Sequence, residues 1–367
     1  MHVGLSVIFQ GPDGAKSDRQ VYQDELKLAD LAEPLDFHSI WAVEHHFTDY
    51  TMSPDVLQFL SYMAGRTKKV KLGSMVVVLP WHVTPIRVAE EVTLLDHLSG
   101  GRFIFGIGRG LGRIEFEGMG VNQEESRARF VEYAGMILEG LEKGYCEGKG
   151  QFIDQPRRDI RPAPFKTFRG RTYAAAVSPE SSQIMARLGV GLLIVPQKPW
   201  ESVLTELEDY RKIYRDVNGT EPPPPLVAGW TIVNEDAAQA EADARKYIGD
   251  YYQSVVDHYE FAGTHLQKMK GYEAYAPMQA AMQEKGAQEA MTDAFVGLHP
   301  WGTPDQVVEK ISGIRDMIGA EGFVGVFSYG GMSAAKAEAN VRLFADKVMP
   351  RLKALGAPGS VVGLAAD

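Results

Sequence analysis

Eight short apolar segments alternate with amphipathic segments along this chain, and this alternation constrains the fold more than any other feature. The apolar segments cover residues 2–9, 39–47, 70–80, 101–110, 171–178, 191–197, 226–234 and 322–331. Their nearly continuous apolar character is typical of strands buried on both faces, and the helical crossovers between them favour parallel pairing. The sequence therefore predicts an α/β fold, a closed (β/α)8 TIM barrel with insertions.

The length of the chain leaves room for additions to this barrel. A plain barrel needs about 250 residues, so about 100 of the 367 remain for insertions. We expect one barrel domain over residues 1–355, with a connector insertion at 146–170 that is rich in Pro, Gly and Arg, and a flexible tail at 356–367. Residues 258–300 form a second insertion, either a lid over the site or a plain helical excursion.

Four hydroxyl-proline pairs mark predicted helix starts. In each pair the hydroxyl residue caps the helix and the proline occupies its first position. The pairs begin at Ser53, Thr84, Ser178 and Thr303. After Thr303 a glutamine completes a capping box.

Composition excludes several classes of protein. The formal net charge of −10 argues against a nucleic-acid partner, which needs clustered Lys and Arg. The single cysteine, Cys146, allows no internal disulfide. The N-terminal residues show no signal peptide, and no apolar run approaches the ~20 residues of a membrane span. We therefore expect a cytoplasmic protein without a membrane partner.

The second predicted strand ends in Glu-His-His-Phe, residues 44–47. Functional residues of TIM barrels lie at the C-terminal ends of the strands. Because strand side chains alternate between faces, His45 and His46 should point in opposite directions and should not chelate one metal ion. We therefore predict no metal site. One of the two histidines should face the pocket as an acid–base or hydrogen-bonding group, the alternative being a purely structural histidine.

Two further strings suit an anionic ligand. Residues 105–112 (FGIGRGLG) end the fourth predicted strand, where glycines let the backbone approach a ligand and Arg109 can pair with a phosphate. The string is no P-loop, and its loose match to G-x-G-x-x-G is weak. Ser178 and Ser181 begin a predicted helix, whose N-terminal N–H groups and dipole favour an anion. Capping explains Ser178 but does not require Ser181. Together with Arg109, the two serines could clamp the phosphate of a mononucleotide.

An ordered set of strings gives the chain a resemblance to a known family. EHHF, GSMVVVLP, AEEVTLLDHLSGGRFIFGIGRGL, GTPDQVVEKI and LFADKVMPRLK follow one another along the chain. In this order they resemble the catalytic α subunit of bacterial luciferase and the luciferase-like monooxygenases, over about residues 1–355. The resemblance implies a (β/α)8 barrel that uses O2 and reduced FMN (FMNH2) from a separate flavin reductase. It also implies a C4a-hydroperoxyflavin that oxygenates a small hydrophobic substrate (aldehyde, ketone or hydrocarbon-like).

The resemblance also assigns roles to individual residues. It implies that His45 is the catalytic histidine and that Arg109, Ser178 and Ser181 contact the flavin phosphate. Ser181 stands in place of a threonine. Val177 replaces an acidic residue of the same cofactor-binding loop, so that contact departs from the family pattern.

Other matched positions surround the flavin ring. Met75 and Val76 match a non-proline cis peptide beneath the ring, and Glu115 matches an acidic residue near the flavin. Gly108 stands where luciferase has a reactive, non-essential cysteine. Residues 270–275 align with the mobile loop of luciferase, which favours the lid interpretation of the second insertion.

The resemblance leaves three functions open. The first is an FMNH2-dependent monooxygenase, and the second is an F420-dependent dehydrogenase or reductase of the same superfamily. The third is a non-catalytic partner subunit like the luciferase β chain, which His45 and Arg109 argue against. Family members are commonly dimeric, and the apolar helices after the second and third strands predict a homodimer or a heterodimer.

Overall fold

Eight parallel strands close into a barrel in the computed structural model, which describes residues 1–176, 178–284 and 286–356. The ring runs β3-β2-β1-β13-β10-β9-β8-β5 and closes through a β3–β5 pairing. Its strands are β1 (His2–Val7), β2 (Ser39–Ala42), β3 (Lys71–Ser74), β5 (Phe103–Gly108), β8 (Thr172–Ala175), β9 (Gly191–Ile194), β10 (Leu226–Trp230) and β13 (Gly322–Val326). Each falls within a predicted apolar segment, so the predicted barrel is confirmed.

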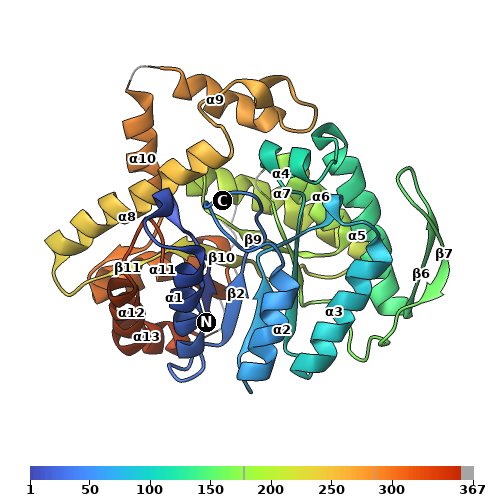
Figure 1. Cartoon of the computed structure of the whole chain (residues 1–367), viewed down its shortest axis with the longest axis horizontal. Coiled ribbons are helices and arrows are strands. Elements are labelled where there is room, and N and C mark those ends of the chain that lie inside the picture. The colour runs from blue at the N-terminus through green and yellow to red at the C-terminus, as the bar shows by residue number, and fades with distance from the viewer. Residues whose placement is uncertain (177, 285, 357–367) are drawn as a thin grey trace, which may run out of the picture.

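Helices surround this barrel and also lie over one of its ends (Figure 1). They are α1 (Asp18–Leu31), α2 (Val56–Arg66), α3 (Pro85–Ser99), α4 (Arg113–Gly118), α5 (Ser126–Lys143), α6 (Pro179–Leu188), α7 (Trp200–Asn218), α8 (Ala237–His258), α9 (Ala276–Met282), α10 (Ala287–Gly297), α11 (Pro304–Ile318), α12 (Ala334–Leu343) and α13 (Met349–Ala354). Short extra strands lie beside the ring: β4 (Val77–Val78) pairs with β5, and β11 (Ile232–Val233) pairs with β12 (Trp301–Gly302).

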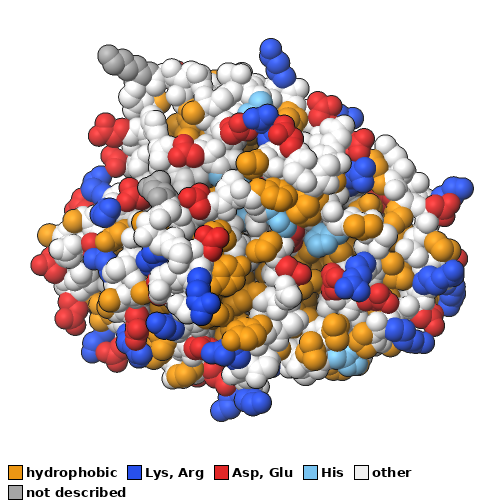
Figure 2. All heavy atoms as spheres, viewed as in Figure 1, with side chains coloured by type: hydrophobic (Ala, Val, Ile, Leu, Met, Phe, Trp, Pro, Cys, Tyr) orange, Lys and Arg blue, Asp and Glu red, His pale blue; other side chains and the backbone are white. Residues whose placement is uncertain are grey.

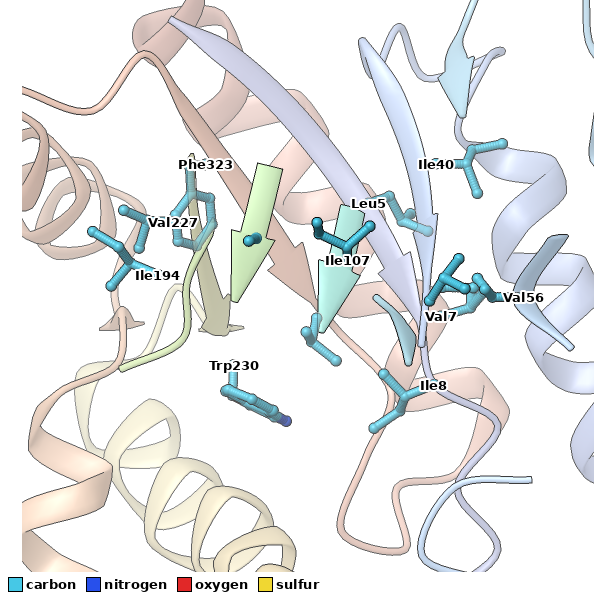
Figure 3. Close-up of a cluster of buried hydrophobic side chains, with 14 of the residues drawn as sticks. Leu5, Val7, Ile8, Ile40, Val56, Ile107, Ile194, Val227, Trp230 and Phe323 are labelled. Atoms are coloured by element: carbon cyan, nitrogen blue, oxygen red, sulfur yellow. The ribbon is translucent and has the colours of Figure 1, made fainter. Parts of the chain in front are cut away.

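The barrel strands are buried on both faces, as their continuous apolar runs predict. Toward the helices, Leu5, Val7 and Val227 belong to one large core (Figure 3). Inside the barrel, Trp41 is completely buried in a second cluster. Its ring leaves no room at Gly73, where an added Cβ would lie 2.3 Å from Trp41.

Three of the four predicted caps begin helices where expected. Thr84, Ser178 and Thr303 each accept a hydrogen bond from the backbone of the first turn, and Thr303 forms the predicted capping box. The prediction at Ser53 was wrong. The Asp55 side chain caps α2 instead, while the Ser53 hydroxyl donates to the Val43 carbonyl at 2.7 Å.

The two insertions have structure of their own. The 146–170 segment is more than an extended connector, because it contributes most of an antiparallel hairpin of β6 (Tyr145–Lys149) and β7 (Asp154–Asp159). The second insertion, residues 258–300, carries α9 and α10 and lies on the same side of the barrel as α4 (Figure 1). It therefore covers the end of the barrel at which strand β5 ends and the chain continues into α4.

Across the described ranges, no helix has both the length and the apolar character needed to cross a membrane.

Candidate active site

One cavity of about 200 Å³ opens at the C-terminal ends of the barrel strands. We call it the mouth cavity. Its walls come from the ends of several strands, from the start of α6, from α8 and from the second insertion. Seven of the residues singled out in the sequence line it: His45, Met75, Val76, Gly108, Arg109, Ser178 and Ser181.

The two adjacent histidines after β2 face different surroundings. His45 lines the mouth cavity, whereas His46 is buried against the Trp81 ring, edge to face at 5.5 Å. The His46 Nε2 lies 3.3 Å from an oxygen of Glu44. This arrangement follows from the alternation of side chains along an extended chain.

Glu44 is a buried anchor for the loop after β3. Its carboxylate accepts hydrogen bonds from the Val78 N–H at 2.9 Å and from the Trp81 indole at 2.6 Å. Burial alone would raise the pKa of Glu44, but hydrogen bonds from His46 and His82 hold that pKa at about 2. Glu44 is therefore a charged structural partner of the wall that carries Met75 and Val76.

Glu115 does not line the cavity but holds one residue that does. It lies on α4, 1% exposed, and its Oε1 is 2.9 Å from the His45 Nδ1. The same oxygen accepts the backbone N–H of His46 at 3.0 Å. Burial would raise the pKa of Glu115, but the charges and hydrogen bonds of His45 and His258 lower it well below its ordinary value. A charged carboxylate thus fixes one nitrogen of His45.

Two arginines converge at one end of the cavity. The Arg109 Nη1 and the Arg127 Nη2 donate to the same carbonyl oxygen, that of Gly271, at 2.6 Å and 2.8 Å. The Arg109 guanidinium also lies on the Tyr272 ring, 4.0 Å from its centroid. Within the described part of the chain, the buried Arg127 Nε has no hydrogen-bond partner. This end can therefore bind an anion with planar, bidentate donors.

The start of α6 faces the same end of the cavity. The Ser178 Oγ accepts the Ser181 N–H at 3.2 Å and lies 2.8 Å from the Ser181 Oγ. Two hydroxyl groups thus stand at the positive end of a helix dipole, close to the cavity. The predicted contact at Val177 lies outside the described residues.

Part of the cavity wall is apolar and tightly packed. The Met75–Val76 peptide is cis, as the resemblance implied. The side chain of Val76 fills the space in which a side chain at position 108 would lie, because an added Cβ at Gly108 would be 2.3 Å from its Cγ2. Gly108 therefore makes room for Val76 and, beyond it, for a ligand.

Sequence reasoning missed two residues of this site. Arg127 lies in the first turn of α5 and His258 ends α8, both far along the chain from the strand ends. Neither lies in a strand–loop junction, which is the pattern that identified His45 and Arg109. The placement of α5 brings Arg127 to the cavity, and the end of α8 brings His258 to Glu115 beside it.

The TIM barrel thus carries, at the C-terminal ends of its strands, a cavity with two arginines, an apolar wall and a histidine held by a buried carboxylate. The family model of luciferase-like monooxygenases matches residues 1–321. The chain belongs to the luciferase-like monooxygenase family, and it is an enzyme of the flavin-dependent monooxygenase class.

Curated relatives match nearly the whole chain. The alkanal monooxygenase alpha chain of Photorhabdus luminescens is 27% identical over 343 residues, which cover 92% of this chain and 94% of that protein. The oxygenase component of the flavin-dependent trigonelline monooxygenase of Acinetobacter baylyi is 24% identical over 369 residues, which cover 95% of each.

Solved structures share the fold. Monooxygenase RslO1 from Streptomyces bottropensis has a TM-score of 0.75 at 26% identity and covers 96% of this chain and 100% of that chain. The oxygenating constituent of 3,6-diketocamphane monooxygenase from Pseudomonas putida, in complex with FMN, has a TM-score of 0.70 at 17% identity, covering 96% and 98%. An F420-dependent secondary alcohol dehydrogenase has a TM-score of 0.71 at 16% identity, covering 96% and 98%. Solved structures with this fold therefore include both an FMN complex and an F420-dependent enzyme.

Proposed function

We propose that this protein is an FMNH2-dependent monooxygenase that oxygenates a small hydrophobic organic substrate. The observation that carries the proposal is the mouth cavity, which joins an anion pocket to an apolar wall beside His45. A phosphorylated flavin has the matching distribution of charge, an anionic tail and a flat aromatic ring.

The anion pocket fits the phosphate of FMN. Arg109 and Arg127 would each turn donors from the Gly271 carbonyl to phosphate oxygens, since a carbonyl is a weaker acceptor than a phosphate. The unpartnered Arg127 Nε supplies a further donor. Ser178 and Ser181 would add their hydroxyls at the start of α6.

The apolar end fits the flavin ring. Met75, Val76 and Gly108 line the wall on which it would lie, and His45 lines the same cavity. When bound, reduced flavin supplies the electrons and the site of oxygen activation. The protein's own task is to hold the ring and exclude water, and to keep His45 in one hydrogen-bonding state through Glu115.

The substrate space is apolar and aromatic. Trp230 at the end of β10, Tyr251 and Val255 on α8, and Phe295 on α10 line the cavity. Figure 3 shows Trp230 beyond the ends of the strands, with its indole nitrogen turned toward Ile8, which also lines the cavity. Such a wall favours an uncharged aldehyde, ketone or hydrocarbon-like molecule and disfavours ionic substrates.

The second insertion acts as the lid in this proposal. Gly271, Ala274 and Tyr275 line the cavity from that side. The Tyr272 ring is fully buried, and its hydroxyl lies 2.9 Å from the Ser126 hydroxyl. A cover anchored in this way keeps water from reactive flavin species.

Two partners complete the proposal. A separate flavin reductase supplies FMNH2, in keeping with a relative that is itself named as an oxygenase component. A second chain covers α2 and α3, where Tyr62, Leu94 and Leu98 are 50%, 47% and 57% exposed. Figure 2 shows hydrophobic side chains on the surface over these helices.

The cofactor is tested by titrating the protein with FMNH2 and with reduced F420 in separate experiments without oxygen. We expect FMNH2 to bind much more tightly. Oxygen labelled with 18O is then admitted with decanal or cyclohexanone present, and one labelled atom should enter the product. Preferential F420 binding, with hydride transfer and no label, would instead establish the dehydrogenase.

A further inference from the structure

A buried carboxylate lies between two imidazoles beside the mouth cavity. Glu115 on α4 faces His45 at 2.9 Å, and its same oxygen lies 3.6 Å from the Nε2 of His258, the last residue of α8. The side chains of Glu115 and His258 are each 1% exposed. The His258 Nε2 has no closer partner among the described residues, so Glu115 is the polar group that it faces.

The imidazole ring of His258 is held in place from two sides. Its Nδ1 lies 3.1 Å from the Thr48 hydroxyl. The Tyr50 ring stacks on His258 with centroids 4.4 Å apart and an interplanar angle of 18°. The same tyrosine meets His45 edge to face at 5.0 Å. Both imidazoles and the carboxylate are thus held as one packed unit.

The positions of the hydrogen atoms follow from the acceptors. The Glu115 carboxylate accepts, so the His45 Nδ1 at 2.9 Å carries the hydrogen of their contact. A hydrogen on the His258 Nε2 would point toward the same oxygen from 3.6 Å. Burial lowers the pKa of His258, and with a hydrogen on Nε2 its Nδ1 can accept from the Thr48 hydroxyl at 3.1 Å.

We infer that His258 is a positioning residue for His45, acting through the Glu115 carboxylate that both imidazoles contact. Its Nε2 lies 3.6 Å from the Glu115 oxygen that contacts His45, so its ring packs against the carboxylate and limits where that oxygen can lie relative to the His45 Nδ1. His258 is the last residue of α8 and the first of the second insertion. Its side chain therefore links the lid to the Glu115–His45 contact. The inference rests on the proposed function for one point only, namely the reaction in which His45 takes part.

Charged groups near the unit must be considered in its pH dependence. Glu260 and Tyr259 follow His258 on the same turn, and Tyr50 faces it from the loop after β2. Arg113 pairs with Glu260 at the surface. The tyrosines have raised pKa values because they are buried, so they stay neutral through the range in which a histidine titrates.

The first test needs no flavin. Protein labelled with 15N at its nine histidines gives the tautomer of each imidazole by NMR. We expect His45 with its hydrogen on Nδ1 and His258 with its hydrogen on Nε2. In His258→Phe, which keeps a ring for stacking on Tyr50, His45 should become a mixture of tautomers. An unchanged His45 signal would overturn the inference.

The second test compares three variants in steady-state oxygenation of decanal with supplied FMNH2. His258→Phe should lower kcat about tenfold to a hundredfold, the range typical when the partner of a functional histidine is lost, with KM little changed. The acidic limb of its pH profile should move to higher pH, because the negative charge of Glu115 then acts on His45 without a second imidazole beside it. His258→Gln restores a donor toward Glu115 and should recover most of the activity.

The possible outcomes distinguish this inference from a metal site and from a failure of the proposed function. His265→Gln, in the same insertion but outside the cavity, is the matched control and should behave as the parent protein. If His258→Gln were as impaired as His258→Phe, the donor would not matter and the inference would be wrong. The three ligand atoms lie within 4.8 Å of one another, so activity lost to EDTA and restored by Zn²⁺ would mark a metal site instead. Failure of FMN to bind the parent protein would overturn the proposed function alone.

Discussion

At the scale of single residues, Arg109 serves two partners. Its guanidinium donates to the Gly271 carbonyl and lies on the Tyr272 ring, and it lines the cavity. Arg109→Ala should weaken FMN binding by about 1.5–3 kcal/mol, roughly tenfold to a hundredfold, through loss of charge-assisted hydrogen bonds. Binding of riboflavin, which lacks the phosphate, should change much less. Fluorescence titration with both ligands measures this, and Arg87→Ala on the exposed face of α3 is the control. Equal losses for both ligands would refute the phosphate contact.

The buried Glu44 carboxylate makes stability depend on pH in a defined direction. Its pKa falls from an ordinary 4.5 to about 2 in the folded protein. A lowered folded pKa gives stability that is complete above the unfolded pKa and is lost as the pH falls toward 2. At about 1.4 kcal/mol per pKa unit the contribution is roughly 3 kcal/mol. Glu44→Gln should therefore reduce the free energy of unfolding by about this amount at pH 7 and by clearly less at pH 4. Urea unfolding at both pH values measures the difference, and an equal loss at both would contradict it.

At the scale of elements, the second insertion depends on one buried ring. Tyr272 is completely buried and bonds Ser126 and the Gly110 carbonyl through its hydroxyl. Tyr272→Ala should increase amide hydrogen exchange across residues 262–282 by about tenfold or more, with no change in the barrel strands. It should also divert reducing equivalents to hydrogen peroxide, because water then reaches the flavin. Tyr272→Phe keeps the ring and should lie close to the parent protein. Unchanged exchange in Tyr272→Ala would show that the insertion is held elsewhere.

Elements were predictable from sequence where local patterns suffice. The eight strands and the caps at Thr84, Ser178 and Thr303 follow from apolar runs and from hydroxyl-proline pairs. The start of α2 was misplaced because Ser53 and Asp55, with a proline between them, both offer a cap, and only the folded structure shows that Asp55 is the one used. Whether the second insertion lies over the cavity could not be read from its sequence, because that depends on contacts with distant strands.

The same limit applies to the candidate site. His45, Arg109 and Ser178 stand at strand ends or helix starts, which the barrel brings to one mouth, so sequence pattern could group them. Arg127 and His258 enter from helix termini elsewhere in the chain, and no spacing marks them. Glu115 was found only through the family resemblance, and its contact with His45 required the geometry of α4.

At the scale of the whole molecule, the exposed apolar face of α2 and α3 predicts association. Leu94 and Leu98 lie four residues apart on α3 and are both about half exposed. We expect the protein to be a dimer in solution by light scattering. Introducing Glu at both positions should produce monomers, because two charges per chain would be buried in the interface. Val217→Glu, at an equally exposed position on α7, should leave the dimer intact. A monomeric parent protein would contradict the prediction.

The contact between Val76 and Gly108 has a consequence for how such enzymes can diverge. The isopropyl group of Val76 occupies the space in which a side chain at position 108 would lie. Neither can grow unless its neighbour shrinks, so substitutions there are expected in compensating pairs. Gly108→Cys, which introduces the residue found in luciferase, should be tolerated here only together with a smaller side chain at position 76.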